Sequence, residues 1–340
     1  MKKIKYLLIL LLLLTVGCGN TKDNKKEPIK KETKIEEKVE KKQEKNNYVS
    51  YNGNLKVDGT NLVNQYNEKI QLRGISTHGI QWFSKFANKE IMKQLKDWGS
   101  NVFRIAMYTE EGGYISNNNL KDKVKEIVEY AKELDMYVII DWHILSDNNP
   151  NNHKDEAIKF FNEMANLYKN TPNVIFEICN EPNGGTSWSD VKSYAIDVID
   201  TIRKNSNNII IVGTPTWSQD VDIASQDKIE KDNIMYALHF YSGTHKEELR
   251  NKVDKALNNG IAIFVSEFGV SDASGNGGVY LEEADKWMEY LNSKNISWVN
   301  WSLADKNESS ALLEPNTSES DNINDHLSES GKYIKEQIKK

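Results

Sequence analysis

The stretch NVIFEICNEP, residues 173–182, combines the two features from which the fold is predicted. Residues 174–179 form a run of mostly apolar residues that favour β-structure, which is typical of a strand buried on both faces. The triplet Asn180-Glu181-Pro182 then places an amide and a carboxylate directly after that strand. The same order, an apolar run followed by polar or aromatic side chains, recurs along the chain.

Eight such runs occur, and amphipathic helical stretches separate most of them. We expect strands at Gln71–Ser76, Val102–Met107, Tyr137–Trp142, Val174–Cys179, Ile209–Gly213, Met235–Phe240, Ala262–Ser266 and Trp298–Ser302. We expect helices at Asn88–Trp98, Leu120–Leu134, Asp155–Tyr168, Trp188–Lys204, Lys246–Leu257, Tyr280–Leu291 and finally Ile323–Ile338. This alternation predicts parallel strands covered by helices, and eight strands close a barrel. The predicted fold class is therefore α/β, a (β/α)₈ TIM barrel.

The structural alternative is an open, doubly wound sheet. Such a sheet usually has fewer strands and often a glycine-rich phosphate loop after the first one, and the sequence has neither feature. Residues 54–72 alternate apolar and polar side chains around Asp58-Gly59 and Asn67, which predicts a short β-hairpin ahead of the barrel. We therefore predict one domain, the barrel with its hairpin, over residues 48–340.

The N-terminus is typical of a targeting segment. Lys2, Lys3 and Lys5 precede the apolar run Leu7–Leu14, and small residues follow before Cys18. The arrangement resembles a bacterial lipoprotein signal, so we predict a signal peptide over residues 1–17 and lipidation of Cys18. An ordinary signal peptide with an incidental cysteine is the alternative.

Residues 18–47 are rich in Lys and Glu and nearly lack large apolar side chains, which predicts a disordered tether. Residues 1–47 contain 13 lysines and 7 acidic residues, which gives this segment a net charge of +6. Since the net charge of the whole chain is −6, the rest of the chain carries −12. An acidic body argues against nucleic acid as a partner. Lipid on Cys18 leaves Cys179 without a disulfide partner, and we expect Cys179 to be a buried, small apolar side chain.

Chemically active side chains follow the expected strands, where the active site of such a barrel lies. Glu181 and Glu267 follow the fourth and seventh strands, which face each other across a ring of eight. Cleavage of a glycosidic bond needs two such carboxyl groups, one to protonate the departing oxygen and one to attack carbon or activate water. Tryptophan and tyrosine at other strand ends suit the apolar faces of sugars.

Other chemistries lack their sequence signatures. The sequence contains no glycine-rich phosphate loop, no cluster of His, Cys and Asp with metal-ligand spacing and no Gly-x-Ser-x-Gly turn. We therefore expect no cofactor and no metal.

At these residues the sequence resembles glycoside hydrolase family 5, in particular its bacterial endoglucanase branch, subfamily 2. The resemblance extends over Tyr51–Leu313. The motifs that recur in order are LRGISTHGIQWF (72–83), NVFRIAMY (101–108), VIIDWHIL (138–145), NVIFEICNEPNG (173–184), NIIIVGTPTWSQDV (208–221), MYALHFYSGTHKEELR (235–250), AIFVSEFGVS (262–271) and VNWSLADKNESSALL (299–313).

The resemblance implies a role for each matching residue. Glu181 corresponds to the general acid/base and Glu267 to the nucleophile. Arg104 corresponds to the arginine that keeps the nucleophile ionised, and Tyr241 to the tyrosine bonded to the same carboxylate. The other implied supporting residues are Asn180, at the sugar 2-hydroxyl, and His143 and His239, at the cleavage point. The implied substrate-binding residues are His78, Trp82, Tyr108, Trp217, Trp301, Lys306 and Glu308.

The predicted function is that of an endo-1,4-β-glucanase acting on cellulose or related β-glucans by a retaining double displacement. We expect a monomer at the outer face of a bacterial envelope, lipid-anchored through Cys18 or secreted. One alternative is an enzyme of the same fold that acts on mannan, xylan or mixed-linkage glucan. The other is a surface lipoprotein that binds glucan without cutting it, although that alternative predicts loss of a carboxylate and both are present.

Overall fold

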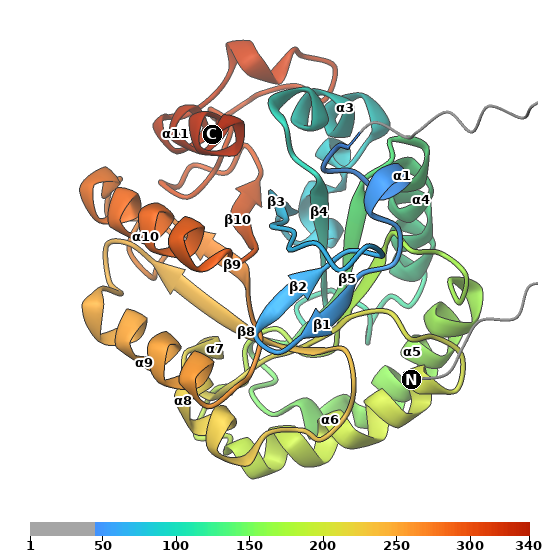
Figure 1. Cartoon of the computed structure of the whole chain (residues 1–340). Coiled ribbons are helices and arrows are strands. Elements are labelled where there is room, and N and C mark those ends of the chain that lie inside the picture. Colours follow the sequence, from blue (N-terminus) through green and yellow to red (C-terminus); the bar gives the residue numbers. More distant parts are fainter. Residues whose placement is uncertain (1–44) are drawn as a thin grey trace, which may run out of the picture. The chain divides into compact units, whose positions relative to one another are not determined.

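A closed barrel of eight parallel strands forms the core of the protein (Figure 1). The computed structural model describes residues 45–340, and the predictions for the signal peptide, Cys18 and most of the tether lie outside the described residues. The barrel strands are β3 (Arg73–Thr77), β4 (Val102–Tyr108), β5 (Tyr137–His143), β6 (Val174–Glu177), β7 (Ile210–Val212), β8 (Ile234–Tyr241), β9 (Ile263–Gly269) and β10 (Trp298–Leu303). β10 pairs with β3 and thereby closes the ring, so the predicted (β/α)₈ barrel is confirmed.

Helices surround the barrel on its outer side (Figure 1). They are α2 (Ile80–Phe83), α3 (Lys89–Trp98), α4 (Leu120–Glu133), α5 (Lys154–Leu167), α6 (Trp188–Arg203), α7 (Pro215–Ser218), α8 (Val221–Ala224), α9 (Glu247–Asn258), α10 (Leu281–Lys294) and α11 (Glu329–Lys339). Short 3₁₀ helices occur at Ser84–Phe86, Pro150–His153, Ser225–Asp227 and Ile323–Asp325. Within residues 45–340, none of these helices has the length and apolar character needed to cross a membrane.

The predicted hairpin is present and covers the amino-terminal ends of the barrel strands. It follows the single turn α1 (Val49–Asn52) and consists of β1 (Lys56–Asp58) and β2 (Asn61–Val63), which pair antiparallel. Leu55 and Leu62 pack in one cluster with interior residues of the barrel. Figure 1 shows the hairpin in front of the ring of strands. The hairpin therefore excludes water from that end.

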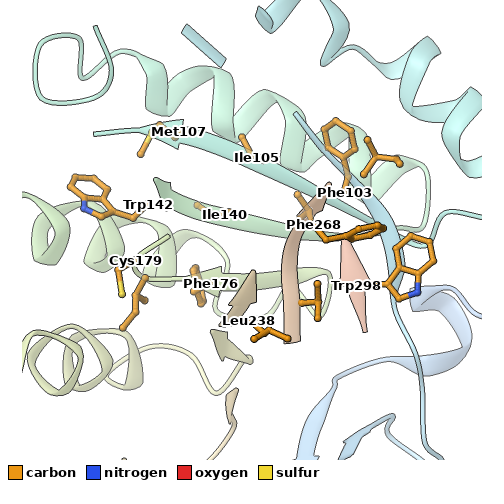
Figure 2. Close-up of a cluster of buried hydrophobic side chains, with 14 of the residues drawn as sticks. Phe103, Ile105, Met107, Ile140, Trp142, Phe176, Cys179, Leu238, Phe268 and Trp298 are labelled. Atoms are coloured by element: carbon orange, nitrogen blue, oxygen red, sulfur yellow. The ribbon is translucent and has the colours of Figure 1, made fainter. Parts of the chain in front are cut away.

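Strand residues alternate between two apolar environments, which explains why the sequence shows continuous apolar runs. On β4, Phe103, Ile105 and Met107 point to the helices, while Val102 joins the cluster inside the barrel. Figure 2 shows the outward cluster, in which the buried Cys179 lies as predicted. On β3, a Cβ added to Gly74 would lie 1.9 Å from the carbonyl oxygen of Val102, so only glycine allows this strand pair to approach.

A β-bulge on β9 changes the alternation near the carboxyl end of that strand. Ala237 of β8 lies opposite Phe264 of β9, and His239 of β8 lies opposite Glu267 of β9. Between these two pairs β8 advances by two residues, whereas β9 advances by three. The neighbour on the other side agrees, since Trp298 pairs with Val265 and Asn300 with Phe268. The additional residue allows two consecutive side chains, Ser266 and Glu267, to face the barrel interior.

The predicted barrel strands and helices agree with the observed ones to within three residues at their ends, except for the last helix, and the short helices α1, α2, α7 and α8 were not predicted. The prediction of one helix over Ile323–Ile338 was wrong. Residues 326–328 interrupt it, because Leu327 forms a bridge with Leu313 and Ser328 accepts a hydrogen bond from the backbone N–H of Gly331. Ser328 therefore caps a new helix, α11, rather than continuing the turn at Ile323–Asp325.

Candidate active site

A cleft of about 700 Å³ lies at the carboxyl ends of the barrel strands. It gathers all but two of the site residues that the sequence predicts within residues 45–340. The predicted residues that line it are His78, Trp82, Tyr108, His143, Glu181, Trp217, His239, Tyr241, Glu267, Trp301, Lys306 and Glu308. The other two, Arg104 and Asn180, are completely buried beneath it.

Glu181 and Glu267 approach each other closely in this cleft. One carboxylate oxygen of each, together with one ring nitrogen of His239, lie within 4.8 Å of one another. Glu267 belongs to β9, whereas Glu181 follows the end of β6 by four residues. Carboxyl groups about 5–5.5 Å apart are typical of retaining glycosidases, while about 6.5–9.5 Å leaves room for the water of an inverting one. The spacing therefore fits direct attack by one carboxylate.

Both oxygens of Glu267 accept a hydrogen bond. Nη1 of Arg104 donates to Oε2 at 3.1 Å, and the hydroxyl of Tyr241 donates to Oε1 at 2.7 Å. Burial and the negative charge of Glu267 raise the pKa of Tyr241 well above its usual value, so the phenol keeps its proton. These two donors fix the position of the Glu267 carboxylate.

Arg104 connects Glu267 to two carboxylates that the sequence analysis did not include in the site. Its Nε donates to Glu177 at 2.7 Å, and its Nη2 lies 3.1 Å from Asp141. Burial disfavours the charged guanidinium, but the charges of Asp141, Glu177 and Glu267 outweigh burial and raise the pKa of Arg104. Burial by itself would raise the pKa of Glu177, but the positive charge of Arg104 outweighs burial and lowers this pKa to about 2. The carboxyl group of Glu177 is therefore ionised.

Glu181 has a different environment. Its Oε1 lies 2.8 Å from Nδ1 of His239, and no other side chain among the described residues forms a hydrogen bond with this carboxyl group. The other ring nitrogen of His239, Nε2, lies 3.0 Å from the hydroxyl of Ser266. Burial opposes protonation of His239, but its interactions with Glu177, Glu181 and Glu267 raise the pKa to about 9.

Asn180 and His143 form a connected pair next to Arg104. Oδ1 of Asn180 accepts from Nη2 of Arg104 at 2.7 Å, and its Nδ2 lies 3.2 Å from Nε2 of His143. Nδ1 of His143 lies 2.7 Å from Asp141. Because the amide donates to Nε2, the ring proton of His143 is on Nδ1. Burial and the charge of Arg104 lower the pKa of His143 to about 3, so the ring is neutral.

One side of the cleft is a continuous group of rings. The centroids of Tyr108 and His143 lie 4.1 Å apart, those of Trp82 and Tyr108 4.9 Å, and those of His78 and Trp301 5.0 Å. Trp82 nevertheless remains 47% exposed. Burial and the nearby Lys306 lower the pKa of His78 to about 3. Such a surface offers apolar faces to sugar rings.

Lys306 and Glu308 add polar groups beside these rings. The Lys306 ammonium lies 2.6 Å from Glu308 Oε2 and 3.5 Å from Nε2 of His78. The Lys306 side chain is 46% exposed, whereas that of Glu308 is 6% exposed. The pair therefore offers the cleft a charged donor in a fixed position.

Trp217 lies at the same cleft on a strained turn. Thr216, Trp217 and Ser218 all have positive φ values, of 57°, 53° and 54°. This left-handed region costs non-glycine residues about 1–2 kcal/mol each. Hydrogen bonds stabilise the turn, from the N–H of Trp217 to the carbonyl of Pro182 and from the Ser218 hydroxyl to the carbonyl of Asn180. The indole is 47% exposed. Strain of this kind commonly accompanies function.

Glu177, Asp141 and Ser266 were not predicted from the sequence, and neither were several residues that line the cleft. Those lining residues are Glu111, Leu145, Gln219, His245, Ala273, Ser274 and Gly275. Glu177 and Asp141 had a usable signal, because each is a carboxylate within an otherwise apolar strand run, where an unpaired charge is costly. Ser266 had none, since serine is common next to a turn.

Glu181, His239 and Glu267 are close enough to one another to be considered as metal ligands. However, both ring nitrogens of His239 have hydrogen-bond partners, and Glu267 is already bonded to Arg104 and Tyr241. A cation would also have to compete with the adjacent guanidinium. We therefore assign none of these residues as a metal ligand.

Comparison with known proteins identifies the family. The model of the cellulase family, glycosyl hydrolase family 5, matches residues 63–307. Endoglucanase 5 of Pectobacterium carotovorum is 54% identical over 86% of this chain and 58% of its own length, and an endoglucanase of Clostridium saccharobutylicum is 56% identical over 85% and 66%. The chain thus spans less than two thirds of the length of these relatives.

Solved structures agree with this assignment. Cellulase Cel5C_n superposes with a TM-score of 0.84 and is 48% identical, over 86% of this chain and 94% of its own. The catalytic domain of Thermobifida fusca endoglucanase Cel5A, in complex with cellotetraose, superposes with a TM-score of 0.83 at 34% identity, over 86% and 99%. From the family model, the sequence identity and the shared barrel, we conclude that the chain belongs to glycosyl hydrolase family 5.

Proposed function

We propose that the chain is an endo-1,4-β-glucanase that hydrolyses internal β-1,4-glucosidic bonds of cellulose or a related β-glucan with retention of configuration. The observation that carries this proposal is the close approach of the Glu181 and Glu267 carboxylates in a cleft lined with rings. The relatives named endoglucanase and cellulase support the same activity.

In the first step, Glu267 attacks the anomeric carbon while Glu181 gives its proton to the departing glycosidic oxygen. The bond to the leaving sugar breaks and a glycosyl–enzyme ester forms. Arg104 and Tyr241 bind one oxygen each of Glu267 and so orient its carboxylate before the attack. Asn180, next to the acid in the chain, is assigned to the 2-hydroxyl of the attacked sugar from its place in the family motif, and its bonds to Arg104 and His143 fix its amide.

In the second step, Glu181 takes a proton from water, and the resulting hydroxide displaces Glu267 from the anomeric carbon. Two inversions at one carbon retain the β-configuration. The enzyme returns to its starting state with Glu181 protonated and Glu267 ionised. No cofactor is needed, since proton and nucleophile both come from the chain and from water.

Sugar units on either side of the cleavage point would stack on Trp82, Tyr108, Trp301 and Trp217, with polar contacts from His78, Lys306 and Glu308. These side chains line one cleft, and the two most exposed rings, Trp82 and Trp217, follow strands on different sides of the barrel. An extended polymer that occupies both sides would be cut in its interior.

The first test is hydrolysis of purified polysaccharides. We expect release of reducing sugar from carboxymethyl-cellulose, with a rapid fall in viscosity because internal bonds are cut. Mixed-linkage glucan also contains β-1,4 bonds, and its hydrolysis would agree with the proposal. Activity confined to mannan or xylan would overturn the substrate assignment, and binding to cellulose without soluble product would overturn the enzymatic one.

The second test follows the anomeric form of the product. Proton NMR during hydrolysis of cello-oligosaccharides should show the β-anomer first, with the α-anomer appearing later by mutarotation. Initial formation of the α-anomer would exclude the double displacement.

We further propose that the enzyme is anchored at the outer face of the envelope through lipid on Cys18. The support is the sequence alone: a basic start, the apolar run Leu7–Leu14 and small residues before the cysteine. Metabolic labelling with a radioactive fatty acid should mark the wild type and not Cys18→Ser. Equal release of both proteins into the medium would contradict an anchor.

A further inference from the structure

Ser266 forms a buried connection between His239 and Glu177. Its hydroxyl lies 3.0 Å from Nε2 of His239 and donates to Oε1 of Glu177 at 2.6 Å. The direct distance from Nε2 to Oε1 is 3.8 Å, too long for a hydrogen bond, so the serine makes the link. Ser266 and Glu177 are completely inaccessible to solvent, and His239 is 2% exposed.

The direction of each hydrogen bond follows from the number of protons available. An ionised carboxylate only accepts, and Glu177 already accepts from Nε of Arg104 at 2.7 Å. The single hydroxyl proton of Ser266 therefore points to Glu177. Its oxygen is left to accept, and the donor that faces it is Nε2 of His239. Nε2 must consequently carry a proton.

This arrangement leaves Nδ1 as the ring nitrogen that gains and loses a proton. Nδ1 faces Oε1 of Glu181 at 2.8 Å. When the ring is neutral, Nδ1 accepts a hydrogen bond from protonated Glu181. When the ring is charged, Nδ1 donates to ionised Glu181. In both cases one proton lies between Nδ1 of His239 and the carboxyl group of Glu181, so the two residues share it.

Several charged or titratable groups surround His239. Those that interact with its ring electrostatically are Asp141 and His143 on β5, Glu177 on β6, Glu181 after β6 and Glu267 on β9. Arg104 on β4 and Tyr241 on β8 are bonded to two of these carboxylates, Glu177 and Glu267. Burial opposes the charged form of His239, whereas its interactions with Glu177, Glu181 and Glu267 favour that form. Ser266 is the group that transmits the charge of Glu177 to the ring through hydrogen bonds.

We propose that Ser266 and Glu177 are positioning residues of the acid/base, which keep a proton on Nε2 of His239 so that Nδ1 alone exchanges a proton with Glu181. This inference rests on the proposed function of Glu181. In the first step the pair loses one proton to the departing oxygen, and in the second it regains one from water. The Nε2 proton never leaves, so the proton balance needs no further group.

The bulge on β9 makes this arrangement possible. In a regular strand, Ser266 and Glu267 would face opposite sides, and only one could lie inside the barrel. The bulge turns both inward, so one strand supplies the nucleophile and the hydroxyl that orients the acid/base.

The test is the pH dependence of kcat/KM for Ser266→Ala on a soluble cello-oligosaccharide. Without the hydroxyl, protonated His239 loses an acceptor, so the alkaline limb should move down by at least about one pH unit. Ser266→Thr keeps a hydroxyl and should restore the wild-type limb. Ser271→Ala, which removes another buried hydroxyl just beyond β9, should leave the limb in place. An activity loss equal at every pH would overturn the proposal.

A second measurement does not depend on activity. ¹⁵N NMR of His239, assigned with His239→Gln, should show Nδ1 titrating while Nε2 stays protonated. A wild-type spectrum in which Nε2 loses its proton overturns the inference, even when Ser266→Ala does not fold. If the wild type has no glucanase activity but Nε2 of His239 stays protonated, the proposed function is contradicted. The inference that Nε2 keeps its proton would then still hold.

Discussion

The same strands carry two unlike layers of side chains inside the barrel. We call Val102, Ile139, Ile175, Ile211, Met235, Phe264 and Val299 the apolar layer, and Arg104, Asp141, Glu177, His239, Ser266 and Glu267 the charged layer. On β4, β5, β6 and β9, a residue of the apolar layer is followed two positions later by one of the charged layer. Both layers are buried, so exposure does not distinguish them.

The difference shows which end of each strand stabilises the fold and which performs chemistry. The apolar layer gains about 25 cal/mol for each Å² removed from water. The charged layer contains three carboxylates around one guanidinium, and desolvation of such groups commonly cancels their attraction. Its value therefore lies in orientation and ionisation, in agreement with the usual division between the two faces of such barrels.

The largest effect should come from Glu267→Gln in the charged layer. We expect kcat on carboxymethyl-cellulose to fall by at least about 10³-fold, because the amide cannot attack carbon. The melting temperature should stay near that of the wild type, since one of several mutually repelling carboxylates is removed. Glu282→Gln, at an exposed site on α10, is the matched control. A near-wild-type rate would remove Glu267 from its proposed role.

The opposite result is expected from Phe264→Ala in the apolar layer. Phe264 is completely buried, and its truncation should lower the free energy of unfolding by about 3–5 kcal/mol. Urea denaturation measures this loss, and the pH profile of the remaining folded enzyme should not change. Leu167→Ala, at a side chain 52% exposed on α5, should cost far less. A similar cost for both would show that the burial of Phe264 does not stabilise the barrel.

Two histidines above the apolar layer, His78 and His143, predict how stability depends on pH. Each has a pKa of about 3 in the folded protein, against 6.5 in the unfolded chain. Between these two pH values the folded histidines remain neutral, whereas those of the unfolded chain bind protons. Stability is thus present above pH 6.5 and is lost as the pH falls toward 3, by at most about 1.4 kcal/mol per pH unit and histidine. Calorimetry between pH 7.5 and 4.5 should show this fall, and a smaller one in His78→Gln. Equal falls in both proteins would refute it.

Trp217→Ala should give the smallest effect, outside both layers. We expect KM for a long cello-oligosaccharide to rise about five- to tenfold, or about 1–1.4 kcal/mol, because one stacking surface is lost. The melting temperature should not fall, since the indole is half exposed. Tyr66→Ala, at a side chain 50% exposed outside the cleft, is the control. An unchanged KM would show that sugars do not use this ring.

The apolar layer and the outer core were predictable because strands buried on both faces need continuous apolar runs. The run around Val174 and Ile175 identified its strand without knowledge of its neighbours. The site was predictable only in part. Glu181 and Glu267 stood out through their neighbours in the chain and the family motifs, but Glu177 looked like an exception within a strand. The subfamily, which the family model does not specify, remains a prediction.

The sequence by itself determined the eight strands, their covering helices, the hairpin and the family, because these depend on periodicity and on short motifs that are local in the chain. Only the tertiary structure decided that Ser266 and Glu267 both face inward, because a bulge appears only when β9 is paired with β8 and β10. It also decided that Ser266 joins His239 to Glu177, three residues on three different strands. Directional contacts between distant strands depend on register, and the bulge that shifts the register of β9 arises only from its pairing with β8 and β10.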